Sequence, residues 1–337
     1  MSILPFSNGL AMDLGTANTL IYEKGRGIIL DEPSAAALNS DTGQAIAVGR
    51  QAKSYLGRTP VGLEVIRPMQ TGVISDFNAA QQMIRRFLRQ ARADRRVFKP
   101  KIIVGVPTWV TQVEKRTLVE AVEKAGAKSV YLVDEPLAAA VGLGLPIEDQ
   151  APSLVLDIGG GVSEGVIIAN GVVAVSESRL AGGDEATEAV ARFLRRKYQI
   201  AVGENMAERI KIAVGSAWPL EKRQIFSCSG KELTSGIPRR LEVDDADVRE
   251  ALAEVVQKLV GLVRQLLMRA TPALTSELMK SGLYLTGGGS LLKGLSQRLA
   301  VETGLKVEVP ENPRLSLVTG LARILENMRY YKKVFVD

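Results

Sequence analysis

Hydrophobic residues along this chain recur with two alternating periods. Short apolar runs, each about the length of a β-strand, occur at 10–14, 19–24, 101–106, 129–133, 153–158, 164–169 and 282–287. Longer amphipathic segments lie between them. In 81–93, Ile84, Phe87, Leu88 and Ala91 follow the i, i+3, i+4, i+7 spacing that places them on one face of a helix. Strands that alternate with such helices predict an α/β protein.

Two further segments are predicted to be helices. In 113–126 the apolar stripe is Leu118, Ala121, Val122 and Ala125, and a glycine follows as the predicted C-cap. Val113 lies about 140° around that helix from Leu118, so we expect it on the outer face. Segment 248–270 is predicted to be a long core helix that ends before a proline. Its apolar positions are Leu252, Val255, Val256, Leu259, Val263, Leu266 and Leu267.

One internal repeat organises the chain. The segment that begins at Ala11 is similar to the segment that begins at Leu156, and each has the pattern of a strand ending in Asp, a glycine turn and a second strand. The matched positions are Asp13 and Asp157, Gly15 and Gly159, Thr19 and Ser163, and Gly27 and Gly171. Two hairpins of this kind predict two similar lobes that face each other across a cleft.

The hairpin tips have the composition of a phosphate site. Glycine lets the backbone approach a phosphate closely, and successive N–H groups at such a turn form an anion-binding concavity. The tips are Gly15, Thr16 and Asn18 in the first hairpin and Gly159, Gly160 and Gly161 in the second. Because two bare carboxylates would repel a polyphosphate, we expect Mg²⁺ between Asp13 and Asp157.

A third glycine cluster follows an apolar strand and precedes a predicted helix. It consists of Gly287, Gly288 and Gly289. This arrangement lets the backbone lie flat against a base or a phosphate and uses the helix N-terminus. Each glycine turn alone is most often only a turn, but three in this order, two of them with an Asp, predict a nucleotide site.

Composition narrows the chemistry. The 337 residues include no His, which excludes His-based triads, metal sites and proton relays, and the single Cys228 excludes an intramolecular disulfide. The net charge of +6 favours an anionic partner such as a nucleotide, nucleic acid or lipid headgroups. No apolar run approaches the roughly 18 residues that span a bilayer, and the first residues do not resemble a secretory signal. We therefore expect a cytoplasmic protein, either free or peripheral to the membrane.

The chain resembles the MreB family of bacterial actin-like proteins. The similar segments follow the family's order from about Leu10 to Gly320, and they include DLGTANTL, GRTP, DEPLAAAVG, DIGGG, AERIK and LTGGGSLLKGL. The glycine turns are shared with Hsp70 chaperones and sugar kinases, whereas the first three strings are far more specific. The resemblance implies an actin-like fold, a duplicated ribonuclease-H-like architecture with two lobes around a nucleotide cleft. It implies lobe I at 1–145, with 321–337 returning to it, and lobe II at 146–320, with subdomain IIB at about 182–245.

The resemblance also implies the site. ATP with Mg²⁺ would lie on Asp13, Gly15, Thr16, Ala17, Asn18, Asp157, Gly159, Gly160 and Gly161, with Glu208 and Lys211 beside the ribose and adenine and Gly287, Gly288 and Gly289 closing the pocket. Without the resemblance, Glu208 and Lys211 at i, i+3 spacing would be an ordinary surface ion pair.

Slow hydrolysis of ATP is the implied activity. Asp157 and Glu135 would be its catalytic acids, because Glu135 matches the family's water-orienting Glu, and Asp134 is a second acid at the same turn. The family has Thr after the DIGGG triplet, where this chain has Val162. A methyl group forms no hydrogen bond to water, so we expect ATP binding to be retained and turnover to be slow, with only Ser163 or water to assist Glu135.

A basic run suggests contact with anionic lipid. Eight Lys and Arg residues between 85 and 101 surround Val97 and Phe98, which match the family's membrane-inserting loop. The N-terminal Ile3, Leu4 and Phe6 are candidates for a second anchor. Without the resemblance, a solvated basic face is the usual meaning of such a run, and no recognition motif supports binding of nucleic acid.

Self-association is the last property that the resemblance implies. The family pairs protofilaments through the helix that carries Val113, so Val113 is a candidate contact in a homopolymer, although a chance exposed Val is the plain alternative. Thr187 replaces an acid that is common in the family at a neighbouring interface. The implied role is a filament on the inner face of the cell membrane that helps to set rod shape, with the membrane proteins MreC and RodZ as partners.

Three classes of protein share this nucleotide site. A sugar or acetate-type kinase needs a second-substrate pocket and usually a longer chain, and an Hsp70-like chaperone needs a further peptide-binding domain. About 17 residues follow Gly320, which argues against the chaperone, and a small-molecule kinase of this superfamily stays an alternative. Magnetosome and plasmid-segregation actins are the nearer alternatives. The sequence leaves open filament polarity and the choice between ATP and GTP.

Overall fold

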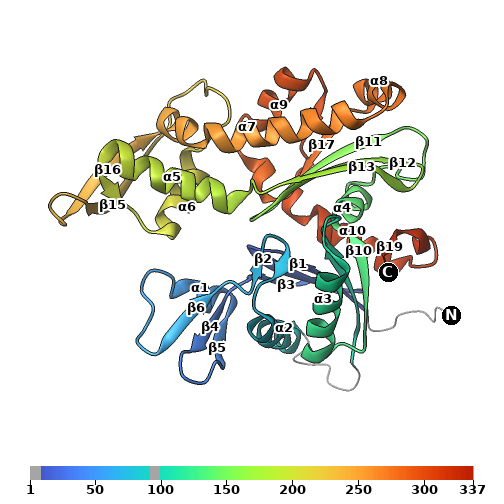
Figure 1. The fold of residues 1–337 in the computed structure, drawn as a ribbon, viewed down its shortest axis with the longest axis horizontal. Helices are drawn as coiled ribbons and strands as arrows, with labels where there is room; N and C mark the ends of the chain where they lie inside the picture. The colour runs from blue at the N-terminus through green and yellow to red at the C-terminus, as the bar shows by residue number, and fades with distance from the viewer. Residues whose placement is uncertain (1–8, 92–98, 337) are drawn as a thin grey trace.

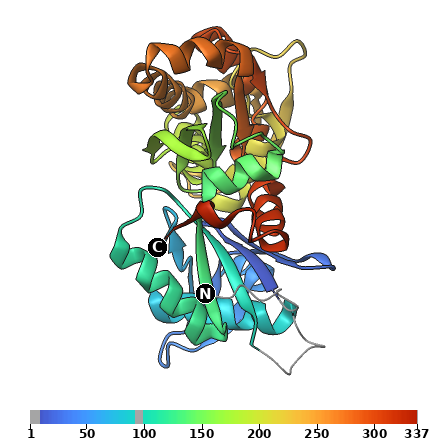
Figure 2. The ribbon, with the colours of Figure 1, turned by 90° about the vertical axis from the view of Figure 1, so that its right-hand side faces the viewer.

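The computed structural model describes residues 9–91 and 99–336, which form two lobes joined at their centre (Figures 1 and 2). The first lobe is built on a six-stranded sheet. In spatial order its strands are β19 (Phe335–Val336), β10 (Ser129–Asp134), β9 (Lys101–Val106), β1 (Gly9–Leu14), β2 (Asn18–Glu23) and β3 (Gly27–Pro33). Strand β1 pairs antiparallel with β2 and parallel with β9.

The second lobe repeats this plan in a five-stranded sheet. In spatial order its strands are β13 (Val172–Arg179), β12 (Ser163–Ala169), β11 (Ser153–Ile158), β17 (Leu283–Thr286) and β18 (Val307–Glu308). Strand β11 pairs antiparallel with β12 and parallel with β17, so it occupies the place that β1 has in the first sheet. All seven predicted strands are present, and the internal repeat is a repeat of structure.

Helices cover the outer face of each sheet. Helices α2 (Phe77–Ala91) and α3 (Gln112–Ala125) bury their predicted apolar stripes against the first sheet. Thr111 and Glu114 form a capping box that starts α3, and Gly126 caps its end. The second sheet is covered by α5 (Gly183–Tyr198), α6 (Glu204–Val214), α7 (Asp245–Arg269), α8 (Pro272–Ser281) and α9 (Leu295–Thr303).

The predicted long core helix is α7, and all but one of its predicted apolar positions are buried. The exception is Leu267, which is only half-buried at the edge of that core. The prediction of the helix and its C-terminal end is confirmed, because α7 ends at Arg269 and Thr271 caps the next helix.

Two helices lie between the sheets, namely α4 (Glu135–Leu143) and α10 (Ser316–Glu326). Their apolar residues form one core with residues from both sheets, including Ala11 of β1 and Val155 of β11. The two backbones touch at Gly142 and Gly320, because a Cβ built at Gly320 would lie 1.7 Å from the Ala138 carbonyl oxygen. This crossing joins the lobes.

Each lobe carries a small extension at the same end of the molecule (Figure 1). In the first lobe it consists of β4 (Ala36–Asn39), β5 (Ala45–Val48), β6 (Leu63–Ile66) and α1 (Gly49–Ser54). In the second lobe α6 packs on a sheet of β14 (Ile200–Ala201), β15 (Ile225–Glu232) and β16 (Pro238–Asp244). The remaining elements are β7 (Met69–Gln70), β8 (Val73–Ile74), η1 (Gly288–Leu291), η2 (Pro313–Leu315) and η3 (Lys332–Val334).

Candidate functional site

Strand alternation brings the two repeat acids together. In β1, Leu10, Met12 and Leu14 pack on the outer helices, whereas Ala11 packs on the core between the lobes. Asp13 follows Ala11 by two residues and therefore faces the other lobe. In β11, Asp157 follows Val155 in the same way. Both acids line one pocket between the lobes.

The first hairpin tip is held in a tight turn. The Gly15 amide donates to the Asn18 carbonyl at 3.1 Å, and a Cβ at Gly15 would lie 2.9 Å from that oxygen. From β3's end the Ser34 hydroxyl donates to the Gly15 carbonyl at 2.6 Å. Thr16, Ala17 and Asn18 line the pocket with Gly15, as predicted for this loop.

The second tip has the equivalent turn hydrogen bond and the equivalent strand register. The Gly159 amide donates to the Val162 carbonyl at 3.0 Å, and Asp157 pairs with Glu164 as Asp13 pairs with Leu20. Gly159, Gly160 and Gly161 all line the pocket. The equivalence of the two turns was the central prediction from the sequence, and it is confirmed.

The two tips touch. A Cβ built at Gly160 would lie 2.7 Å from the Cβ of Ala17, and one built at Gly161 would lie 3.2 Å from the Thr16 hydroxyl oxygen. Any side chain at these two positions would push the tips apart, which explains why the second turn needs consecutive glycines. The Thr16 hydroxyl also accepts a hydrogen bond from the Gly72 amide at 3.0 Å.

Four carboxylates line the pocket, and none has an ordinary pKa. Burial and the charge of Asp157 raise the pKa of Asp13 to about 7, although Arg314 opposes this shift. Burial raises the pKa of Asp157 to about 6 and that of Glu164 to about 7. Burial, followed by the charges of Asp13 and Asp157, raises the pKa of Glu135 well above its usual value. The concentration of negative charge is unfavourable in the protein alone.

A hard cation fits this arrangement. Within the described ranges no three His, Cys, Asp or Glu side chains are grouped closely enough to hold a metal ion by themselves. Mg²⁺ usually keeps several waters and binds through one or two carboxylates together with phosphates, rather than in an all-protein cage. The pocket supplies Asp13 and Asp157 beside glycine amides, which is that partial set of ligands.

The two candidate acids at the start of α4 differ in position. Glu135 lines the pocket and packs against Gly105, where a Cβ would lie 3.1 Å from the Glu135 Cγ. Asp134 is the N-terminal flanking residue of α4 and is not among the residues that line the pocket. Glu135 is therefore the acid that can reach a bound ligand.

Val162 lines the pocket, but Ser163 does not. The Ser163 hydroxyl is buried and donates to the Ala181 carbonyl, so the idea that Ser163 assists Glu135 is wrong. The predicted place of Thr187 beside a filament interface stays a prediction. Thr187 is buried in α5, where its hydroxyl contacts the Lys211 ammonium group at 2.8 Å.

Two glycines of the third cluster belong to the pocket, and one does not. Gly287 and Gly288 line the pocket, and Gly287 has a φ of +77° and leaves no room for a Cβ beside Asp157. Gly289 does not line the pocket, because it packs on Ile158, whose Cγ2 would be 2.2 Å from a Cβ there.

Glu208 and Lys211 lie outside the pocket that the hairpin tips form. Glu208 forms an ion pair with Lys53 of the first lobe at 3.1 Å. The Lys211 ammonium donates to the Gly183 carbonyl at 2.8 Å, and burial lowers its pKa. The Gly183 amide in turn donates a hydrogen bond to the Gly159 carbonyl of the second tip, so Gly183 connects Lys211 to that tip. Their predicted contact with the base stays a prediction.

Among the pocket residues that sequence reasoning missed, three have polar or charged side chains. Glu164 is buried and accepts a hydrogen bond from the Thr108 amide at 3.1 Å. Thr286 and Arg314 approach from the second lobe. The repeat itself could have identified Glu164, because it stands where the first hairpin has Leu20. No motif pointed to Arg314.

The predicted contact surfaces differ in what the structure describes. Val113 is 73% exposed on α3, as expected from its helical position. Val97 and Phe98, as well as Ile3, Leu4 and Phe6, lie outside the described residues. No helix in the described ranges has the length and apolar character needed to cross a bilayer.

Known proteins resemble this chain over nearly its whole length. A family model described as MreB/Mbl protein matches residues 7–333. The cell shape-determining protein MreB of Escherichia coli strain K12 is 42% identical over 327 residues, which cover 95% of this chain and 94% of the relative. The cell shape-determining protein Mbl of Bacillus subtilis strain 168 is 39% identical over 323 residues, which cover 96% and 97%.

Solved structures of related proteins have the same fold as this chain. The crystal structure of MreB5 of Spiroplasma citri bound to ADP is 28% identical, covers 97% of this chain and 98% of its own, and has a TM-score of 0.91. The same protein bound to AMPPNP is 27% identical over the same shares, with a TM-score of 0.90. The predicted actin-like fold is confirmed.

Proposed function

This chain belongs to the MreB/Mbl family of cell shape-determining, actin-like cytoskeletal proteins, and from that membership we propose that it binds ATP with Mg²⁺ in the pocket between its lobes. The observation that carries the proposal is the pair of equivalent hairpin tips, each with a carboxylate at its base and glycine amides at its turn. The ADP and AMPPNP bound to the Spiroplasma citri relative support the choice of an adenine nucleotide.

Different residues would hold the phosphates and the metal ion. The amides of the two glycine turns would donate to phosphate oxygens, since such turns form anion-binding concavities. Asp13 and Asp157 would hold the Mg²⁺, which supplies positive charge to the phosphates. Their raised pKa values support this role, because a bound cation favours the ionised form of both carboxylates.

Hydrolysis requires a group that orients water. Glu135 would accept a hydrogen bond from the attacking water, which its ionised carboxylate can do and its protonated form does poorly. The cation beside Asp13 and Asp157 would favour that ionised form. Val162 offers the water no hydrogen bond, so we propose slow turnover.

Self-association and membrane binding complete the proposal. The chain would form a homopolymer of paired protofilaments, with the exposed Val113 on α3 as a pairing contact. The basic run that contains Val97 and Phe98 would bind anionic lipid on the inner face of the cell membrane. MreC and RodZ are the partner proteins that we propose for the cell-shape role.

Calorimetry and electron microscopy test the proposal together. We expect ATP to bind in the presence of Mg²⁺ and to bind far more weakly without it, with loss of binding in Asp13→Ala and in Asp157→Ala. On an anionic lipid monolayer the parent should form paired filaments with Mg-ATP, and Val97→Ser combined with Phe98→Ser should remove them from the lipid. A parent without Mg²⁺-dependent nucleotide affinity would overturn the proposal.

A further inference from the structure

One cation lines a pocket that is otherwise acidic. Among the residues that line the pocket in the described part of the chain, Arg314 has the only positively charged side chain, and four lining residues are carboxylates. The phosphate loops contain no Lys or Arg of their own. A polyphosphate in this pocket would therefore meet backbone amides, acids and a single guanidinium group.

The backbone at Arg314 is fixed to the wall of the pocket. The carbonyl of the preceding Pro313 accepts hydrogen bonds from the Thr286 hydroxyl at 3.0 Å and from the Gly287 amide at 3.1 Å. Thr286 and Gly287 line the pocket themselves. The backbone at the start of the Arg314 side chain is thus held in place by the second lobe.

That guanidinium group is held by a partner in the first lobe. Arg314 Nη1 donates to Asp31 Oδ1 at 3.2 Å, and Nη2 contacts the other carboxylate oxygen. The two side chains are 43% and 32% exposed, so water screens the pair, and an exposed pair of this kind is weak. A better anion could displace Asp31.

Strand register places Asp31 close to the acids of the phosphate site. Asp13 pairs with Leu20, and Leu20 pairs with Asp31, so the three residues share one face across adjacent strands. Two strand spacings separate Asp13 from Asp31 by about 10 Å between their Cα atoms. A small rotation of the Arg314 side chain would carry its guanidinium from Asp31 towards a ligand bound at Asp13.

We propose that Arg314 is a phosphate-binding residue, which releases Asp31 and binds the polyphosphate of the nucleotide when the pocket is filled. Its planar, permanently charged group suits a bidentate contact with phosphate oxygens, and such charge-assisted hydrogen bonds are stronger than an exposed ion pair. The inference rests on the proposed nucleotide site and deepens it.

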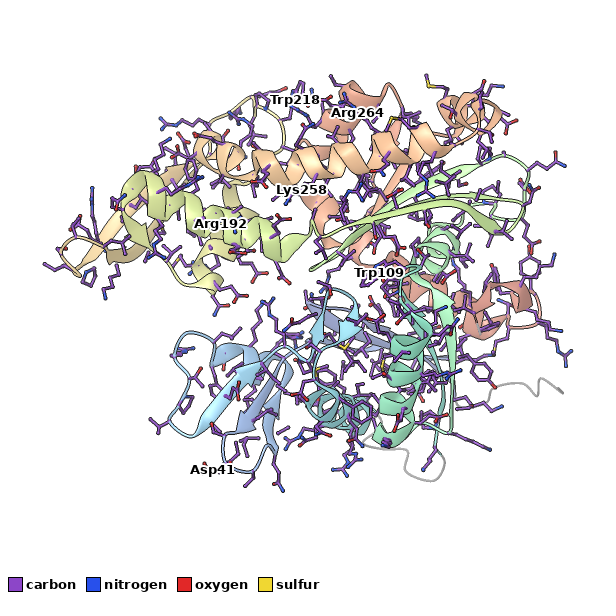
Figure 3. All side chains as sticks on the ribbon, in the orientation of Figure 1. Asp41, Trp109, Arg192, Trp218, Lys258 and Arg264 are labelled. Carbon is purple, nitrogen blue, oxygen red and sulfur yellow. The ribbon has the colours of Figure 1, made fainter. Side chains whose placement is uncertain are left out.

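Titration of ATP and of adenosine into four proteins tests the inference. We expect Arg314→Gln to weaken ATP binding by about tenfold or more, since hydrogen bonds to charged groups are worth that much, and to leave adenosine binding unchanged. Asp31→Asn should bind ATP at least as tightly as the parent, because it frees the guanidinium. The control is Arg264→Gln, which removes an exposed Arg on α7 that is paired with Glu302, on the far side of the second lobe (Figure 3).

The outcomes separate this inference from the proposed function. If the parent and the control bind Mg-ATP and Arg314→Gln binds it equally well, the inference fails and the nucleotide site stands. An equal loss for ATP and adenosine, or a loss in Asp31→Asn as large as in Arg314→Gln, would show that the ion pair serves only to hold the structure and would also overturn the inference. Failure of the parent to bind ATP would instead overturn the proposed function.

Discussion

The apolar side chain of Val162 limits the hydrogen bonds that one wall of the pocket can form. Val162 lines the pocket beside Glu135, and the adjacent Ser163 hydroxyl is committed to the Ala181 carbonyl. The next side chain that returns to the pocket is Glu164, an acid that cannot donate a hydrogen bond once ionised. From Val162 to Glu164, therefore, this strand offers the pocket no side chain that donates a hydrogen bond once Glu164 is ionised.

We expect Val162→Thr to raise the rate of ATP turnover about fivefold, because one added hydrogen bond to the water is worth about 1 kcal/mol in the transition state. A phosphate-release assay at saturating Mg-ATP measures the change. Val301→Thr, an equal substitution at an exposed position of α9, is the control and should leave the rate unaltered. A Val162→Thr protein no faster than the parent would contradict the explanation.

Glu164 makes the nucleotide-free protein sensitive to pH. The pKa of Glu164 is about 7 in the folded protein and near 4.5 in the unfolded chain. Between these two pH values the carboxyl group is therefore protonated in the folded state and ionised in the unfolded state. Stability should thus fall as the pH rises from about 4.5 through about 7. Without nucleotide and Mg²⁺, Glu164→Gln should be more stable than the parent by roughly 1–3 kcal/mol at about pH 8 and equal to it at low pH.

Urea denaturation across that pH range measures the free energy of unfolding. Glu188→Gln serves as the matched control, because Glu188 is an exposed residue of α5 that pairs with Arg192. It should change the free energy by no more than about 0.5 kcal/mol at any pH. A parent and a Glu164→Gln variant with parallel pH profiles would show that Glu164 is not protonated in the folded protein.

At the scale of elements, helix α3 has two distinct faces. Leu118, Ala121, Val122 and Ala125 are buried against the first sheet, whereas Val113 stands on the outer face among polar neighbours. An apolar side chain in that position adds nothing to the core. It is therefore free to serve a contact with a second copy of the chain.

We expect Val113→Asp to leave the monomer intact and to separate paired protofilaments into single ones, because it places a charge in an apolar contact. The free energy of unfolding should change by no more than about 0.5 kcal/mol, as is usual at exposed sites. Negative-stain microscopy with Mg-ATP distinguishes single from paired filaments. Val301→Asp, at a similarly exposed position in the second lobe, should keep the pairs, and pairs that persist in Val113→Asp would exclude this contact.

Much of the fold was predictable at this scale, and the site was predictable in part. The strands and amphipathic helices follow from periodicity, and the match of Asp13 with Asp157 in the sequence predicts the paired hairpins. Ser163 and Thr187 could not be placed, because local sequence does not say which way a hydroxyl turns at the end of a strand or on a helix. The pocket role of Arg314 depends on a contact with Asp31, 283 positions away in the chain.

At the scale of the whole molecule, ion pairs join the two small extensions across the cleft. Lys53 of α1 pairs with Glu208 of α6 at 3.1 Å, and Arg67, which follows β6, pairs with Asp184 of α5 at 2.9 Å and with Glu204. All of these side chains are partly exposed, so each pair is worth less than about 1 kcal/mol. Together these ion pairs favour an arrangement in which the two lobes are close, but they are too weak to hold the lobes in it.

We expect Lys53→Glu to speed release of a bound fluorescent ATP analogue by up to about fivefold, because repulsion from Glu208 replaces an attraction of at most about 1 kcal/mol. Stopped-flow measurement at low salt gives the rate. The difference should vanish at high salt, because the ion pair is exposed. A difference that persists at high salt would assign Lys53 a different role.

The contact of α4 with α10 at Gly142 and Gly320 has a mechanical consequence. This contact lies where the two lobes join, and the extensions that bear Lys53 and Glu208 lie at the opposite end of the molecule (Figure 1). A small rotation of one lobe about these glycines would therefore move the outer ends of the extensions much farther than the residues beside the glycines. A second subunit bound to those ends would then respond to whether its neighbour holds a ligand, although the ligand itself is far from the contact between the two subunits.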